Sequence, residues 1–185
     1  MIVKMGRSEL KTNKVVVLLF QEDTSKLSRV LRKLNVDYQI LEPNDTPNFI
    51  PTHIILSGSP KSVYDTDAYP LPSWVLASEA KVLGICYGMQ LIAHTFGGIV
   101  WKMLNLEHGP TKITEIRNGR QKIKTRMMNH QDQVVKLPET FDITAVTNKN
   151  HIASFTDHKR FWAVQYHPED TNYPDLRTFK RFLKQ

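Results

Sequence analysis

Cysteine is almost absent from this sequence: Cys86 is the only one in 185 residues. A single thiol cannot form an internal disulfide, so a reducing compartment is expected. No apolar run approaches the roughly 20 residues needed to cross a bilayer, and residues 1–14 have no apolar core of the secretory kind. These absences predict a cytoplasmic, globular protein with no membrane role.

Excess charge is scarce in the body of the chain, although the formal net charge is +7. Residues 1–14 and 175–185 each carry four basic side chains against one acidic side chain, which leaves +1 for everything between. Basic ends are usually only solvated, whereas nucleic-acid binding needs a basic patch on one face of the fold. We therefore expect no nucleic-acid partner.

Nucleotide and metal motifs are also missing. The segment IILSGSPKSVYD, residues 54–65, matches neither a Walker A loop nor a pyrophosphatase loop of the form Ser-Gly-Gly-x-Asp-Ser. No His-x-x-x-His or Cys-x-x-Cys spacing occurs. We expect no ATP site and no metal site in this chain.

The chain has the length of one domain, which we place at residues 14–185, after a polar extension at residues 1–13 for which disorder is the default. Strand-like and helix-like segments alternate in the first half, and the second half is β-rich. This order predicts an α/β fold with a mostly parallel central sheet flanked by helices. The expected strands are 14–20, 37–41, 52–57, 81–85, 111–116, 122–127, 141–147, 152–156 and 161–167; the expected helices are 24–34, 74–80, one after Cys86, and 174–185.

Cys86 lies between an apolar strand-like run and an amphipathic helical pattern. Gly84 and Gly88, two positions to either side, allow strand and helix to approach closely around a strained residue. The partial positive charge at a helix N-terminus favours a thiolate there. The turn alone is equally compatible with a reactive nucleophile and with a buried structural cysteine.

A nucleophilic cysteine needs a base and a group that orients the base. In FWAVQYHPED, the proline favours an extended backbone at His167, so His167 and Glu169 can project to one side. Glu169 can then hold the imidazole in one tautomer. The alternative is a surface turn with two unrelated polar residues. Backbone N–H groups in the Ser-Gly-Ser-Pro turn and at Tyr87 are candidates for stabilising an oxyanion.

Four segments occur in this order between about residue 14 and about residue 170: ILSGSPKSV, LGICYGMQLIAHTFGG, MNHQDQVVKLP and WAVQYHPE. Together they resemble the class I (triad) glutamine amidotransferases, which have a flavodoxin-like fold, and within them the amidotransferase part of GMP synthases. The resemblance implies Cys86 as nucleophile, His167 as general acid and base, and Glu169 as its orienting group. It also implies Ser59 and Tyr87 as oxyanion-hole donors, and Gln90, Asn129, Gln131 and Asp132 as glutamine-binding residues.

Several positions depart from the family pattern. Ser59 stands where glycine is common, and a side chain there is expected to narrow the pocket or to change the φ open to the donor. Asn129 and Gln131 replace Ser and Gly of the GMP synthase pattern. The turn LLFQEDTSKL after the first strand and the segment DTNYP after the histidine also differ.

The resemblance implies a glutaminase that forms a glutamyl thioester and supplies ammonia to a separate ATP-dependent synthetase, in GMP synthases for the amination of XMP to GMP. ATP and magnesium are expected only in that partner. Two alternatives stay open: a free-standing hydrolase of glutamine or γ-glutamyl compounds, or one that serves a different acceptor; and a catalytically silent binding protein.

Overall fold

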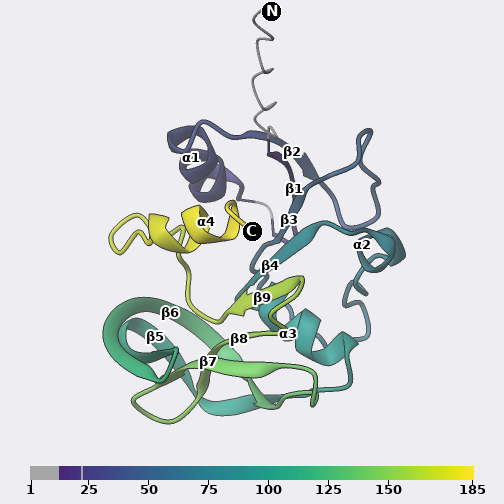
Figure 1. Cartoon of the computed structure of the whole chain (residues 1–185). Helices are drawn as coiled ribbons and strands as arrows, with labels where there is room; N and C mark the ends of the chain where they lie inside the picture. Colours follow the sequence, from purple (N-terminus) through teal and green to yellow (C-terminus); the bar gives the residue numbers. More distant parts are fainter. Residues whose placement is uncertain (1–12, 22) are drawn as a thin grey trace, which may run out of the picture.

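The computed structural model describes residues 13–21 and 23–185 (Figure 1). In this part of the chain nine strands form one sheet, in the order β2-β1-β3-β4-β9-β8-β7-β5-β6. The strands are β1 (Lys14–Leu18), β2 (Asp37–Leu41), β3 (His53–Leu56), β4 (Lys81–Ile85), β5 (Ile99–Arg117), β6 (Arg120–Lys136), β7 (Asp142–Thr147), β8 (Ile152–Thr156) and β9 (Phe161–Val164). The helices are α1 (Ser25–Lys33), α2 (Ser73–Ala77), α3 (Tyr87–Thr95) and α4 (Leu176–Phe182).

The sheet is parallel in one half and antiparallel in the other. Strands β2, β1, β3, β4 and β9 pair in parallel, whereas β9, β8, β7, β5 and β6 pair antiparallel. The predicted α/β fold with a β-rich second half is confirmed, and the second half extends the same sheet. Because β3, β4 and β9 are parallel neighbours, the loops that follow them meet at one edge of the sheet.

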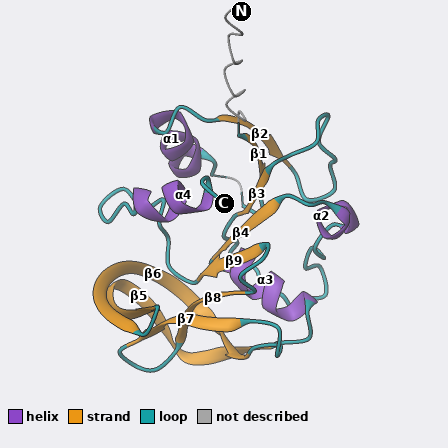
Figure 2. Cartoon of the chain, viewed as in Figure 1, coloured by secondary structure: helices purple, strands orange, loops and turns teal. Residues whose placement is uncertain are grey.

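Helices cover the two faces of the parallel half, as Figure 2 shows. Strand β1 explains why both faces need cover: its side chains alternate between two apolar clusters, and both sets are buried. Val15 and Val17 belong to the cluster that contains residues of α1 and α4. Val16 and Leu18 belong to the cluster that contains residues of α2 and α3.

The long hairpin of β5 and β6 is the main element that sequence reasoning underestimated. The sequence predicted only residues 111–116 and 122–127 as strands, whereas the hairpin runs from residue 99 to residue 136. Its turn is Asn118-Gly119, with φ of 48° and 70°, as a two-residue hairpin turn requires. The register shifts between Lys102 and Glu107, so the first part of β5 lacks the simple alternation that predicts a strand.

The N-terminal extension predicted at residues 1–13 lies outside the described residues, apart from Asn13. The Asn13 side chain donates a hydrogen bond to the carbonyl of Leu183, just after α4 (3.0 Å). Within residues 13–21 and 23–185, none of the helices combines the length and apolar character needed to span a bilayer.

Candidate active site

Cys86 occupies the sharp turn between β4 and α3. Its φ of 52° and ψ of −106° belong to a backbone region that side chains rarely adopt. The Cys86 N–H donates to the carbonyl of Val164 at the end of β9 (2.8 Å), and the Gly88 N–H donates to the carbonyl of Ser57 (3.1 Å). These two bonds tie the turn to both neighbouring strands and hold the strained residue in place.

Gly84 and Gly88 make this turn sterically feasible. A Cβ at Gly84 would lie 2.6 Å from the carbonyl oxygen of Gly88, and a Cβ at Gly88 would lie 2.4 Å from the carbonyl oxygen of Leu56. The close strand-to-helix approach predicted from these glycines is therefore present.

His167 and Glu169 lie together just beyond β9. His167 Nδ1 is 2.7 Å from Glu169 Oε1, and the Glu169 side chain is 4% exposed. The carboxylate is therefore shielded from solvent and hydrogen-bonded to the imidazole. The backbone N–H of His167 donates to the carbonyl of Met127 in β6 (2.9 Å). The paired arrangement agrees with the predicted orientation of the two side chains and excludes the reading as an unrelated surface turn.

The environment of His167 favours the charged imidazolium. Burial lowers the pKa of His167, but its interactions with Cys86 and with Glu169 more than offset this, and the pKa stands well above the usual 6.5.

Gly58, which sequence reasoning passed over, brings Cys86 and His167 together. A Cβ at Gly58 would lie 3.2 Å from His167 Cε1 and 3.6 Å from Cys86 Cβ. The loop after β3 therefore packs between the two side chains because it has no side chain of its own here. The signal was available, since this glycine stands in the Ser-Gly-Ser-Pro turn.

A cavity of about 1030 Å³ opens over this edge of the sheet. Seven of the nine predicted site residues line it: Cys86, His167, Ser59, Gln90, Asn129, Gln131 and Asp132. The other two, Glu169 and Tyr87, do not line the cavity. Glu169 contacts His167 from behind, and the Tyr87 ring packs against Phe20 (ring centroids 5.2 Å apart). The structure thus gathers the predicted residues from four different segments of the chain around one cavity.

The two predicted oxyanion donors stand at separate loops of this edge. Tyr87 opens α3, and Ser59 follows Gly58 in the loop after β3. Among the described residues, neither backbone N–H has a hydrogen-bond acceptor. Ser59 is not among the described residues with positive φ, and its hydroxyl accepts the N–H of Lys61 (3.1 Å). The serine therefore leaves the backbone in an ordinary conformation and adds a side chain to the cavity wall.

Gln90 and Asp132 both line the cavity, and hydrogen bonds hold both side chains in place. The side-chain amide of Gln90 donates to the carbonyl of Asp132 (2.9 Å) and to Gln165 Oε1 (3.2 Å), so only its oxygen is left for a ligand. The Asp132 carboxylate accepts hydrogen bonds from the hydroxyls of Ser62 and Tyr64. Ser62 and Tyr64 carry no local sequence signal for this role, because the contact spans about 70 positions of the chain.

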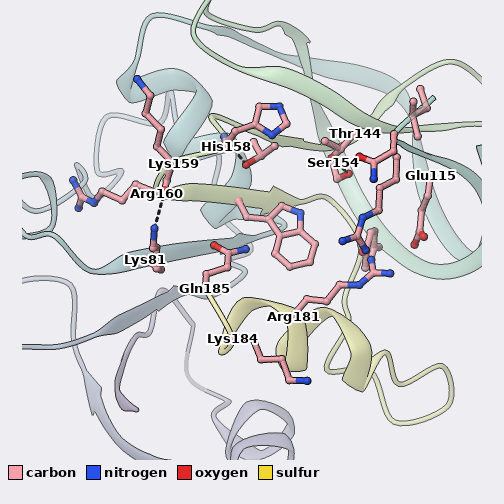
Figure 3. A pocket seen from close by; sticks show the side chains of 16 residues that line it. Lys81, Glu115, Thr144, Ser154, His158, Lys159, Arg160, Arg181, Lys184 and Gln185 are labelled. Atoms are coloured by element: carbon pink, nitrogen blue, oxygen red, sulfur yellow. Dashed lines mark hydrogen bonds between the residues drawn. The ribbon is translucent and has the colours of Figure 1, made fainter. Parts of the chain in front are cut away.

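A second cavity, of about 690 Å³, is lined by residues of β4, β5, β7, β8 and β9 and of the C-terminal end of α4 (Figure 3). Six lysine or arginine side chains line it, among them Lys81, Arg181 and Lys184, against one acidic side chain, Glu115. None of the predicted site residues lines it. In the described part of the chain, no group of three His, Cys, Asp or Glu side chains is arranged to hold a metal ion.

The sequence matches known proteins along nearly its whole length. The family model described as glutamine amidotransferase class-I matches residues 20–185. The glutamine-hydrolyzing GMP synthase of Thermotoga petrophila is 39% identical over 177 residues, which cover 91% of this chain and 35% of that protein. The corresponding protein of Campylobacter lari is 38% identical over 171 residues, 86% of this chain and 34% of that protein. The chain therefore spans about a third of the length of these curated relatives.

Solved structures agree with this match. A Thermoplasma acidophilum protein, described as one subunit of a GMP synthase, superposes with a TM-score of 0.84 at 26% identity, covering 94% of this chain and 93% of that chain. A glutamine amidotransferase from Thermotoga maritima superposes with a TM-score of 0.73 at 21% identity, covering 94% and 81%, which bears on the fold alone. On the family model and the curated relatives together, this chain belongs to the class I glutamine amidotransferases.

Proposed function

We propose that this chain hydrolyses glutamine through Cys86, His167 and Glu169 and delivers the ammonia to a separate synthetase. The observation that carries the proposal is the strained Cys86 at the start of α3, sharing one cavity with a His167 that Glu169 orients at 2.7 Å. A purely structural cysteine would need neither the strained backbone nor the neighbouring imidazolium.

The proposed reaction begins with attack of the Cys86 thiolate on the side-chain amide carbon of glutamine. The N–H groups of Ser59 and Tyr87 donate to the oxyanion that forms. His167 gives its proton to the leaving nitrogen, the C–N bond breaks, and ammonia and a γ-glutamyl thioester result. Water then loses a proton to His167 and attacks the thioester, the C–S bond breaks, and glutamate leaves with the thiolate restored.

We further propose that the substrate lies along residues 129–132 of β6. Asn129 and Gln131 are exposed in the cavity, whereas Asp132 is buried and held by Ser62 and Tyr64. The Asn129 carbonyl accepts a weak hydrogen bond from the Cys86 thiol (Sγ to O, 3.8 Å), so this strand passes directly beside the nucleophile. A glutamine bound along it would present its side chain to Cys86.

The acceptor that we propose is XMP, aminated to GMP in a partner subunit that binds the ATP and magnesium. Two facts support a partner: the curated relatives are GMP synthases about three times as long, and an apolar segment lies exposed beside the cavity. Leu104 is 99% exposed and Trp101 is 67% exposed, and Leu106 lines the cavity itself. Exposed apolar side chains gathered next to a site commonly mark a surface for another protein.

The test measures ammonia and glutamate release from glutamine by the purified chain and by Cys86→Ala. Each is assayed with and without the ATP-pyrophosphatase subunit of a two-subunit GMP synthase charged with XMP, ATP and magnesium. Low release by the chain alone, a rise with the partner and loss in Cys86→Ala would support the proposal. Strong release that is the same with and without the partner would indicate a free-standing hydrolase. No release under any condition would overturn the proposed activity.

A further inference from the structure

Glu107 and His130 form a buried pair behind the cavity wall. They are directly opposite each other in the β5–β6 ladder, and their side chains are only 4% and 2% exposed. His130 Nε2 lies 3.2 Å from Glu107 Oε2, and His130 Nδ1 lies 2.9 Å from the backbone carbonyl oxygen of Asp132. The proposed reaction uses neither side chain.

The two contacts of the His130 ring cannot both be favourable in a neutral imidazole beside an ionised carboxylate. The carbonyl of Asp132 only accepts, so Nδ1 must carry a proton. A neutral ring then has a lone pair on Nε2, and this lone pair would face the carboxylate oxygen of Glu107. The contact of Nε2 with Oε2 is a close ion-pair distance without the alignment of a hydrogen bond. One additional proton, on either Nε2 or the Glu107 carboxyl, turns this repulsive contact into an attractive one.

We propose that Glu107 and His130 share one additional proton at neutral pH, and that this protonated pair is a positioning element that fixes the substrate-binding segment 129–132. The inference rests on the proposed glutaminase function for its kinetic consequence, but the proton itself is a property of the resting protein.

Other charged groups around the pair are few. His151 Nδ1 lies 3.4 Å from Glu107 Oε2, and the Lys149 ammonium, on an exposed side chain, lies 3.7 Å from Oε1. The carboxylate of Asp132 is turned toward the hydroxyls of Ser62 and Tyr64. Burial lowers the pKa of His130, the hydrogen bond to the Asp132 carbonyl and the charge of Glu107 raise it, and the neighbouring His151 and His167 lower it, with a net lowering.

The pair acts on the site through the backbone of β6. The carbonyl of Asp132 accepts hydrogen bonds from His130 and from Gln90 (2.9 Å each), which fix this end of the segment from two sides. At the other end, the carbonyl of Asn129 meets the Cys86 thiol. Loss of the shared proton leaves Nε2 and the carboxylate in repulsion, so His130 shifts and the Asp132 carbonyl loses one of its two side-chain donors.

The kinetic test compares Glu107→Ala with Glu107→Gln. In Glu107→Gln the amide NH₂ can donate to a neutral Nε2, so the contact survives without the additional proton. We expect Glu107→Ala to raise the KM for glutamine about tenfold with kcat within about threefold, and Glu107→Gln to restore the KM. In the unaltered protein the KM rises at alkaline pH as the shared proton is lost, and in Glu107→Gln this rise disappears. Glu115→Gln is the control, because it removes a carboxylate from the same strand. Arg126, the partner of Glu115, still has a second carboxylate partner, Asp175, at 2.7 Å.

The proton is read independently of activity by ¹⁵N signals of the His130 ring and the ¹³C signal of the Glu107 carboxyl. At neutral pH we expect a bound proton on Nδ1 and one further proton on either Nε2 or the carboxyl, which is released at alkaline pH. A ring with one proton beside a fully ionised carboxylate at neutral pH would overturn the inference, as would the same KM profile in Glu107→Gln and the unaltered protein. If the chain hydrolyses no glutamine, the NMR experiment still decides whether the pair holds its proton.

Discussion

Cys86 combines two properties that rarely coincide in one residue, a strained backbone and a buried side chain. The residue is 5% exposed, yet it lines the cavity and its thiol meets the carbonyl of Asn129. Replacing Cys86 with alanine should lower glutaminase turnover by at least about 1,000-fold, because no other thiol exists in the chain. The assay is glutamate release, with circular dichroism to verify folding; activity near that of the unaltered protein would refute the role of the thiol.

Glu169 should make stability depend on pH through His167. A pKa raised in the folded state stabilises the fold fully below the unfolded value of 6.5, and this contribution is lost as pH rises through the folded pKa. In Glu169→Gln one cause of the raised pKa is gone, and each unit by which the pKa falls removes about 1.4 kcal/mol of that contribution. We expect the free energy of unfolding to fall less steeply with rising pH in Glu169→Gln, measured by urea denaturation between about pH 6 and about pH 9.

A matched control exists on the surface. Asp142 Oδ2 lies 2.9 Å from His158 Nε2, but both side chains are well exposed. An exposed pair of this kind contributes little, so Asp142→Asn should leave the pH dependence unchanged. Equal slopes in Glu169→Gln and the unaltered protein would contradict the raised pKa of His167.

The positions of the candidate triad could be predicted from the sequence, but the contacts that support them could not. Cys86, His167 and Glu169 lie in turns whose local sequence indicates their conformation, and the structure brings them together. For Gln90, predicted to bind glutamine, the sequence did not indicate that the amide nitrogen is already bonded to Asp132 and Gln165. These bonds join positions far apart in the chain, and no local pattern encodes them.

At the scale of elements, the strand-turn-helix unit of β4 and α3 depends on Gly88. Gly88→Ala would place a Cβ 2.4 Å from the carbonyl oxygen of Leu56, which only movement of α3 away from β3 can relieve. We expect a loss of at least about 1–3 kcal/mol in the free energy of unfolding, together with lower activity. Urea denaturation measures the first and glutamate release the second.

Gly119→Ala is the control for this substitution. No atom lies within 4 Å of a Cβ at Gly119, so only the cost of its φ of +70° remains, about 1 kcal/mol. If Gly88→Ala proves no more destabilising than Gly119→Ala, the close approach of α3 to β3 does not constrain the turn.

Elements with regular patterns were predicted well and irregular ones were not. The bounds of β2 and β4 agree with the predicted ranges 37–41 and 81–85, since both are short runs with clear ends. The first part of β5 was missed because its register shift breaks the alternation of side chains. The Asn-Gly turn was the available signal that a longer hairpin surrounds the two short strands predicted there.

For the whole molecule, the exposed segment at residues 101–106 should matter only when a partner is present. Replacing Leu104 with serine removes apolar surface that is 99% exposed, so the fold and the basal reaction should be unaffected. Stimulation of glutamine hydrolysis by the synthetase subunit should fall at least about fivefold, which corresponds to about 1 kcal/mol of lost docking energy. The measurement is glutamate release against partner concentration.

The control lies far away in the sequence, on a loop rather than on β5. Ile50, between β2 and β3, is 89% exposed, and Ile50→Ser removes a similar apolar side chain. It should leave stimulation intact. Equal effects of the two substitutions would show that residues 101–106 are not a specific docking surface. The predicted cytoplasmic location stays a prediction, and so does the polar extension at residues 1–13, of which only Asn13 lies among the described residues.

The place of β6 at the end of the sheet has a consequence for self-association. An outermost strand presents unpaired backbone groups that can template pairing with another chain, and β6 carries Ile123 and Val135 exposed along it. Arg120, Lys122 and Lys124 alternate with the residues around Ile123, and like charges resist the approach of a second copy. Because the same strand continues into residues 129–132, pairing along this edge would also disturb the segment that we propose as the substrate wall, so these cations would protect both solubility and that segment.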